Sequence, residues 1–276
     1  MSDTNQEQIE FWNGEAAETW VRSQAQVDAM LAPLSEIALA RANPRPGERA
    51  IDIGCGCGTT TLALAEQGAS VWGIDVSVPM LAHARGRAQG LDNVAFSQTD
   101  AATQTYTPDH QLLFSRFGVM FFDDPAAAFA NLRTALTEDG RLVFICWQKP
   151  SANAWMSVAG QAVQPFLPQP ATPPDPQAPG PFAFADPDYI RDLLLEAGYV
   201  RISVESVTTL LHLGDDLDSV MAAQSEIGPL ARAIAELEGE SRDQALAAAR
   251  QALAPHVTDA GLDLGAACWL VAAHYS

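Results

Sequence analysis

The sequence predicts an α/β protein built around a mostly parallel sheet, with helices covering both of its faces. Short apolar runs recur between residues 50 and 145, and helical stretches of 9 to 12 residues separate them. Strands that alternate with helices in this way form βαβ units, which bury a parallel sheet on both sides. A turn with three glycines at residues 54–58, between the first strand and its helix, marks where backbone N–H groups can approach a ligand closely.

The elements are expected in a regular order. An N-terminal helical region at residues 8–42 comes first, and the rigid sequence NPRPG at 43–47 ends it. Five strands follow, at 50–53, 70–74, 93–96, 111–114 and 141–145. Helices are expected between them at 59–67, 79–89 and 125–136, and a turn at 136–140 precedes the fifth strand. Ser77 before Pro79 and Asp124 before Pro125 are residue types that cap and start helices.

The chain beyond residue 150 departs from this alternation. Eight prolines between 165 and 181 predict a semi-rigid loop. A helix is expected at 186–197, with Asp186 as its N-cap and Pro187 in its first turn. Strands at 199–211 and 266–274 enclose a helical insert at 215–254. A seven-stranded sheet that closes with an antiparallel strand follows from this order.

This layout divides the chain into three segments. Residues 1–46 form a helical cap segment, residues 47–150 form the ligand-binding core, and residues 151–276 add a helix and two closing strands to that core. The proline-rich loop at 165–181 and the insert at 215–254 are expected to complete the cap. Open α/β sheets bind ligands at the carboxyl ends of their strands, so the cap is expected to lie above that edge.

Composition excludes several classes of partner. A formal charge of -19 and a single lysine, Lys149, leave no basic surface for nucleic acid. No apolar run approaches the roughly 18 residues that a membrane helix needs. The N-terminus, MSDTNQEQIE, is polar and acidic and has no apolar leader. A cytoplasmic protein without a membrane span is therefore expected, and its four cysteines do not indicate a disulfide framework.

The glycines of the turn, rather than its cysteines, indicate the chemistry. Cys55 and Cys57 form a C-x-C pair with no third or fourth ligand nearby, which is a poor zinc signal. Their small side chains are better explained as filling a tight turn.

The glycine spacing indicates which kind of ligand the turn binds. A dinucleotide site has the pattern G-x-G-x-x-G, whereas the sequence here gives G-x-G-x-G and places Thr59 where the last glycine would stand. Asp52, at the tip of the preceding strand, would repel a pyrophosphate and suits a ligand with a cationic end.

Five motifs in order resemble those of the class I S-adenosylmethionine-dependent methyltransferases. Asp52 and the three glycines match the first motif of that family. Asp75 ends the second strand, 21 residues after Gly54, where the family has the acid that binds the ribose hydroxyls. Thr99-Asp100-Ala101 resembles the motif that contacts adenine. The fourth and fifth strands follow in order, and the turn before the fifth is similar to that of the ubiquinone-biosynthesis-like, or type 11, branch.

The resemblance implies a Rossmann-like methyltransferase sheet with a helical cap, the cofactor S-adenosyl-L-methionine and the product S-adenosyl-L-homocysteine. Two aromatic residues of the first segment, Trp12 and Trp20, either fold over the cofactor as in related enzymes or staple the first helix to the core. The residues that the resemblance assigns to the cofactor site are these two and Asp52, Gly54, Cys55, Gly56, Gly58, Thr59, Asp75, Val76, Ser77, Met80, Asp100, Ala101, Ser115, Arg116 and Phe117.

The expected reaction is in-line methyl transfer to a small, largely apolar or aromatic acceptor. Phe121, Trp147 and Trp155 follow strands four and five, where an acceptor pocket would lie, although core packing also explains each of them. No catalytic base is evident, and His212 is the one candidate. Asp123-Asp124 invites a metal interpretation, but helix capping by Asp124 explains it better, so no metal is expected.

Two other functions compete with methyl transfer. A nicotinamide-dependent oxidoreductase is disfavoured because the chain lacks the dinucleotide glycine spacing. The Tyr-x-x-x-Lys pair of short-chain dehydrogenases is also impossible, because Lys149 is the sole lysine and the residue four positions before it is Ile145. A cofactor-binding protein without transferase activity remains open. The acceptor, the methylated atom and the oligomeric state are not indicated by the sequence.

Overall fold

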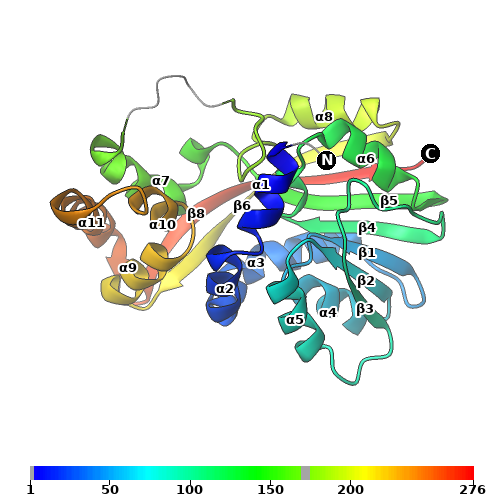
Figure 1. Cartoon of the computed structure of the whole chain (residues 1–276), viewed down its shortest axis with the longest axis horizontal. Helices are drawn as coiled ribbons and strands as arrows, with labels where there is room; N and C mark the ends of the chain where they lie inside the picture. Colours follow the sequence, from blue (N-terminus) through cyan, green and yellow to red (C-terminus); the bar gives the residue numbers. More distant parts are fainter. Residues whose placement is uncertain (1–2, 169–174) are drawn as a thin grey trace.

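One eight-stranded sheet organises the computed structural model of the chain, which describes residues 3–168 and 175–276 (Figure 1). Seven strands follow the order β3-β2-β1-β4-β5-β8-β6, and the short β7 pairs with β8. β1 to β5 are parallel, while β8 runs antiparallel to both β5 and β6. The expected mostly parallel sheet with an antiparallel closing strand is confirmed, and the short β7 adds an eighth strand to the seven expected. The strands are β1 (Arg49–Ile53), β2 (Ser70–Asp75), β3 (Val94–Gln98), β4 (His110–Arg116), β5 (Leu136–Trp147), β6 (Val200–Gly214), β7 (Val257–Thr258) and β8 (Gly261–His274).

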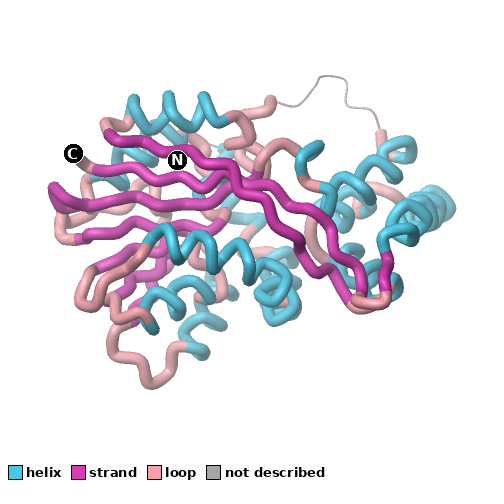
Figure 2. Tube along the Cα trace, turned by 180° about the vertical axis from the view of Figure 1, so that it is seen from behind, coloured by secondary structure: helices cyan, strands magenta, loops and turns pink. Residues whose placement is uncertain are grey.

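Helices cover both faces of the sheet, as the near-continuous apolar strands require. On one face lie α3 (Gln24–Ala42), α4 (Thr59–Glu66) and α5 (Val78–Arg87), and on the other lie α6 (Pro125–Arg133) and α8 (Pro187–Glu196) (Figures 1 and 2). Three expected N-caps are confirmed, because the side chains of Ser77, Asp124 and Asp186 accept backbone N–H bonds at the starts of α5, α6 and α8.

The N-terminal region is three helices rather than the continuous helical stretch expected at 8–42. α1 (Asp3–Phe11) and α2 (Glu15–Arg22) precede α3. The first break has a physical cause in Asn13, whose amide Nδ2 donates to the carbonyl of Val76 (3.0 Å) and whose Oδ1 accepts the N–H of Val78 (2.9 Å). These bonds tie the chain to the loop after β2, and Gly14 then starts α2 from an extended conformation.

The turn expected at 136–140 is wrong, because these residues belong to β5. Leu136 already pairs with His110 of β4, and the next pair joins Arg141 to Leu112, so β5 advances five residues while β4 advances two. The extra residues form an irregular bulge at the start of the strand. The bulge folds tightly at Gly140, where a Cβ would lie 2.8 Å from the Leu136 side chain.

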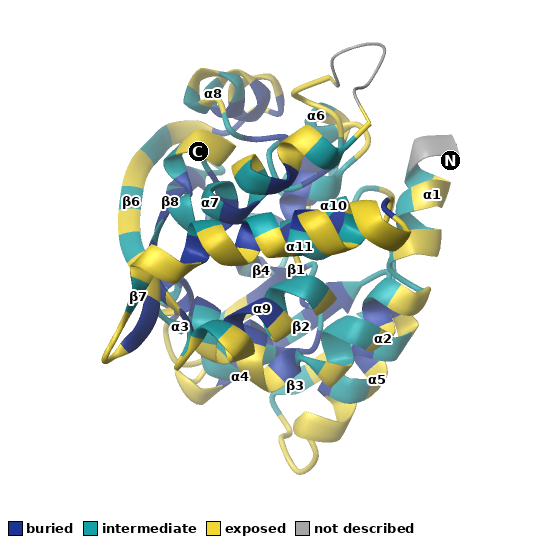
Figure 3. Ribbon diagram, turned by 90° about the vertical axis from the view of Figure 1, so that its left-hand side faces the viewer, coloured by how far each residue is buried: buried dark blue, intermediate teal, exposed yellow. Residues whose placement is uncertain are grey.

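Beyond β5, helices gather around an extension of β6 and β8. These two strands are longer than expected and project from the rest of the sheet as a ribbon (Figure 2). An unexpected helix, α7 (Ala154–Val163), packs against two helices of the insert, α10 (Pro229–Ile234) and α11 (Gly239–Leu253) (Figure 3). The third insert helix, α9 (Leu217–Glu226), is joined to α7 by a hydrogen bond from Gln224 to the carbonyl of Trp155. Short 3-10 turns complete the chain at η1 (Val119–Phe121), η2 (Pro150–Ala152), η3 (Gln164–Phe166) and η4 (Ala254–His256).

Parts of the expected layout stay predictions. Residues 169–174 of the proline-rich loop lie outside the described residues, and the division of the chain at 46 and 150 is not tested by the fold. Within the described ranges, none of the helices combines the length and hydropathy needed to cross a bilayer.

Candidate functional site

The glycine turn lies at the carboxyl end of β1, against the end of β4. Gly54 has φ +64°, and a Cβ on it would lie 2.8 Å from the Cα of Gly118, so the two backbones touch and leave no room for a side chain. Gly56 has φ +52°, but the nearest atom to its Cβ position is the Sδ of Met80, 3.7 Å away. Packing therefore requires the glycine at 54, whereas at 56 a Cβ would meet Met80 only at an ordinary contact distance.

Asp75 joins the turn to the end of β2. Its Oδ2 accepts the N–H of Gly56 (2.8 Å) and its Oδ1 accepts the N–H of Ser77 (2.8 Å). Burial raises the pKa of this carboxyl group, and the two N–H donors oppose that rise. Each carboxylate oxygen has further lone-pair capacity, so Asp75 can accept additional hydrogen bonds from a ligand.

Asp52 is fully buried beneath the turn. Its Oδ2 accepts the hydroxyls of Thr60 (2.8 Å) and Thr61 (2.6 Å) from the first turn of α4, while its Oδ1 is buried without a hydrogen-bond partner. Burial raises the pKa of Asp52 to about 6, and the threonine hydroxyls oppose that rise. The carboxylate thus has one oxygen held by α4 and one oxygen left to accept a donor.

The first two helices lie over the turn. Trp12 contacts Trp20 (ring centroids 6.2 Å apart) and Phe121 (5.3 Å), and Cys57 and Met80 are buried in the same small apolar cluster. The arrangement brings together residues that the sequence assigned separately to cofactor and acceptor.

Two asparagines that sequence reasoning missed hold α1 in place. Asn5 donates to Oδ2 of Asp100 (3.0 Å), and Asn13 bonds Val76 and Val78 as described above. The loops after β2 and β3, which carry Asp75 and Asp100, are therefore both linked to the first helix.

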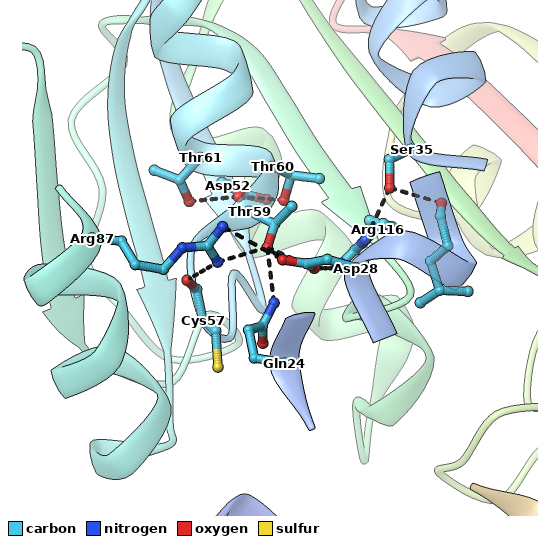
Figure 4. A network of polar contacts seen from close by, with 11 residues as sticks. Gln24, Asp28, Ser35, Asp52, Cys57, Thr59, Thr60, Thr61, Arg87 and Arg116 are labelled. Carbon is cyan, nitrogen blue, oxygen red and sulfur yellow. Dashed lines mark hydrogen bonds and ion pairs between the residues drawn. The ribbon is translucent and has the colours of Figure 1, made fainter. Parts of the chain in front are cut away.

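A polar network joins α3 to the turn from the other side (Figure 4). The hydroxyl of Thr59 donates to Asp28 (2.6 and 2.8 Å), and Arg87 donates to Thr59 and to the carbonyl of Cys57 (both 2.9 Å). Asp28 was not identified from the sequence, although Gln24, Asp28 and Ser35 break an otherwise apolar face of α3 and so mark a buried polar contact.

Arg116, expected to contact the cofactor, is turned toward α3. Its guanidinium donates to Ser35 (2.9 Å) and lies 3.7 Å from Asp28. Burial lowers the pKa of Arg116, and the nearby carboxylates of Asp28 and Asp52 oppose that decrease. In this position it balances the buried carboxylates under the turn.

Aromatic rings form a row at the carboxyl ends of β4 and β5. Phe117, held at φ +64°, stacks on Trp147 with centroids 4.2 Å apart and ring planes 6° from parallel. Trp155 of α7 follows at 5.1 Å from Trp147, and its indole Nε1 is buried without a hydrogen-bond partner. The three expected acceptor residues therefore separate into two groups, because Phe121 lies with Trp12 instead.

The other expected residues have structural partners. Ser115 donates to the carbonyl of Ile53 (2.8 Å) and accepts the N–H of Gly118, and Ala101 is buried. Cys55 is a buried free thiol, and burial raises the pKa of Cys57 to about 12. No group of three metal-ligating side chains lies within the described ranges of the chain.

His212, the candidate base, lies on the projecting β6–β8 ribbon. Its Nδ1 is 2.8 Å from Asp263 and its Nε2 is 3.3 Å from Asp215. The two carboxylates raise the pKa of this exposed imidazole. A ring with both nitrogens held by carboxylates favours the protonated form, which cannot accept a proton.

Comparison with known proteins gives one family match. Residues 50–140 match a family model described as a methyltransferase domain. An aklanonic acid methyltransferase of a Streptomyces species (strain C5) is 32% identical over 152 residues, which are 53% of this chain and 64% of that protein. The chain thus spans less than two thirds of the length of that relative.

Solved structures share the fold at low sequence identity. A putative methyltransferase from an antibiotic biosynthesis pathway of Anabaena variabilis has a TM-score of 0.60 and 15% identity, covering 88% of this chain and 96% of its own. Haemonchus contortus phosphoethanolamine N-methyltransferase 2, in complex with phosphomonomethylethanolamine and S-adenosylhomocysteine, has a TM-score of 0.54 and 19% identity, covering 88% and 52%.

Proposed function

We propose that this chain, whose residues 50–140 belong to the class I S-adenosylmethionine-dependent methyltransferases, transfers a methyl group from S-adenosylmethionine to a small, largely apolar or aromatic acceptor. The observation that carries the proposal is Asp75, which holds the glycine turn at Gly56 while keeping lone pairs for a ligand. The assignment to the type 11 branch stays a prediction.

The residues around the turn fit this cofactor. Asp75 would accept the ribose hydroxyls with its remaining lone pairs. The partnerless Oδ1 of Asp52 suits a donor on a cationic ligand end, because an ammonium group would satisfy a buried carboxylate oxygen. Trp12 and Trp20, which lie against Met80 and Cys57 beside the turn, would cover the bound cofactor from solvent.

The chain has little covalent work to do in this reaction. S-adenosylmethionine supplies an electrophilic methyl group on a sulfonium centre. The protein would hold the acceptor in line with that methyl group and exclude water from the site. The aromatic row of Phe117, Trp147 and Trp155 offers planar apolar surface for such an acceptor, and its buried Nε1 donor suits an acceptor oxygen. The relative's name, aklanonic acid methyltransferase, supports a small-molecule acceptor, as does the formal charge of -19.

A turnover assay tests the proposal. The protein is incubated with deuterium-labelled methyl donor and a small-molecule extract, and labelled products are sought by mass spectrometry. Wild type is expected to give at least one labelled product that Asp75→Ala fails to give. If S-adenosylhomocysteine binds but no extract yields a labelled product, the chain is a cofactor-binding protein without transferase activity.

A further inference from the structure

A cavity of about 180 Å³ lies where the first helix meets the cap insert. Its lining comes from four separate parts of the chain: α1, η1, the end of the proline-rich loop and α10. The lining residues are Glu7, Gln8, Phe11, Phe121, Pro179 and Arg232.

This cavity adjoins the glycine turn through two rings. Phe121 is one of its walls, and the ring of Phe121 contacts Trp12 with centroids 5.3 Å apart. Trp12 in turn packs in the apolar cluster with Met80 and Cys57, beside the turn. A molecule that enters the cavity would therefore contact Phe121, which is one of the residues expected to contact the acceptor and lies against Trp12.

Arg232 gives the cavity a cation that forms no ion pair with a carboxylate of the described residues. Its guanidinium carbon lies 5.5 Å from the centre of the Phe11 ring, and no described carboxylate oxygen comes within 4.0 Å of its nitrogens. Arg250, on the neighbouring helix α11, is by contrast paired with Asp218. The chain has 34 acidic and 15 basic side chains, so an arginine without an acidic partner, facing a cavity, is an available anion site.

The side chains of Arg232 and Phe11 that line the cavity favour a carboxylate as the group bound there. A guanidinium binds a carboxylate through two parallel hydrogen bonds, and its planar fork also lies against aromatic rings. Glu7, exposed on α1, lines the same cavity and would repel a second negative charge.

We propose that Arg232 is a specificity-determining residue that binds a single carboxylate on the acceptor, and that Glu7 opposes that charge. The proposal deepens the proposed function and rests on it, because the cavity serves an acceptor only if the glycine turn holds the methyl donor.

The test compares one acid with its uncharged counterpart. Binding of 2-naphthoate and of 2-naphthamide to the protein saturated with S-adenosylhomocysteine is measured by equilibrium dialysis, for wild type and three variants. Arg232→Gln is expected to weaken 2-naphthoate binding about tenfold, the size of a partly solvated charged hydrogen bond, and to leave 2-naphthamide unchanged. Glu7→Gln is expected to strengthen 2-naphthoate binding about two- to threefold. Arg250→Gln removes the same charge from the cap away from the cavity and is expected to change neither.

Several outcomes would overturn the proposal. It is wrong if wild type binds neither compound, if it binds the acid and the amide equally, or if Arg232→Gln weakens both to the same extent. Binding of S-adenosylhomocysteine is measured separately by calorimetry. Loss of that binding in wild type would instead contradict the proposed function, so the two failures are distinguishable.

Discussion

At the scale of single residues, Asp75 is the centre of the proposed cofactor site. Its two oxygens hold backbone N–H groups of the turn and of the next loop, so the carboxylate is already oriented before a ligand binds. Asp75→Ala would remove charged hydrogen bonds worth about 1.5–3 kcal/mol. Affinity for S-adenosylhomocysteine is expected to fall about ten- to a hundredfold by calorimetry, with a similar loss for adenosine. Asp92→Ala, which removes an exposed carboxylate before β3, is the matched control, and unchanged affinity of the Asp75 variant for both ligands would refute the ribose role.

Gly56 and Gly54 make a second comparison at this scale. Gly56→Val places a branched side chain at a positive φ, where its Cβ would meet the Sδ of Met80 at an ordinary contact distance of 3.7 Å, so the protein should fold, at a backbone cost of about 1–2 kcal/mol, but lose cofactor binding. Gly54→Val drives a side chain into the backbone of Gly118 and should prevent folding. Circular dichroism and calorimetry separate the two effects. A folded Gly56→Val variant with wild-type affinity would contradict the assignment of the turn.

Asp52 makes stability depend on pH. Its folded pKa of about 6 is raised above the ordinary value of 3.8, so the folded state binds the proton more tightly than the unfolded state. The contribution of Asp52 to the free energy of unfolding of the cofactor-free protein is therefore largest below about pH 4. That contribution falls by up to about 3 kcal/mol as the pH rises through 6.

Asp52→Asn tests this dependence. The variant should lose that decline and be more stable than wild type in urea at pH 7.5, while binding the cofactor more weakly. If the difference in the free energy of unfolding between the variant and wild type is the same at pH 4 as at pH 7.5, the raised pKa assigned to Asp52 is contradicted.

Sequence reasoning reached some of these residues and not others. Asp75 and the glycines are fixed by local chemistry, since the strand-turn-helix path requires positive φ values at set positions. The direction of Arg116 was not predictable, because its partners Ser35 and Asp28 lie on α3, about eighty residues earlier in the chain. The partnerless Oδ1 of Asp52 is likewise a property of packing, not of pattern.

At the scale of elements, we propose that the contact between α1 and the loops after β2 and β3 governs access to the site. Asn13→Ala would remove the bonds to Val76 and Val78, which leaves α1 without its link to the Asp75 loop. S-adenosylhomocysteine is expected to dissociate several-fold faster, while the melting temperature changes little. Gln6→Ala, which loses only an exposed bond to Glu10 within α1, is the control, and equal dissociation rates for the two variants would count against a covering role.

The two boundaries that were predicted wrongly, between α1 and α2 and at the start of β5, have the same kind of cause. The break between α1 and α2 depends on partners more than sixty residues away, and the bulge of β5 depends on its register with β4. Tertiary contacts, rather than local propensity, decide these two boundaries. α7 is a different case, because its buried residues Met156, Ala159 and Val163 recur at helical spacing and could have indicated a helix.

At the scale of the whole molecule, the sheet was predictable and the cap was not. Alternating strands and helices, with right-handed crossovers, leave few possible orders for a parallel sheet, so the sheet itself was expected, although its strand order β3-β2-β1-β4-β5-β8-β6 was not assigned in advance. The meeting of α1, η1, the proline-rich loop and α10 joins segments that are distant in the chain and carry no common pattern. The proposed acceptor side of the protein is therefore visible only in three dimensions.

The central claim is that the glycine turn and Asp75 hold a sulfonium nucleoside cofactor and not a dinucleotide. Calorimetric titration of the wild-type protein with S-adenosylhomocysteine, and in parallel with NAD, tests this claim most directly. The expected result is saturable binding of S-adenosylhomocysteine at one site per chain, with no binding of NAD. Absence of S-adenosylhomocysteine binding, or equal binding of both compounds, would contradict it.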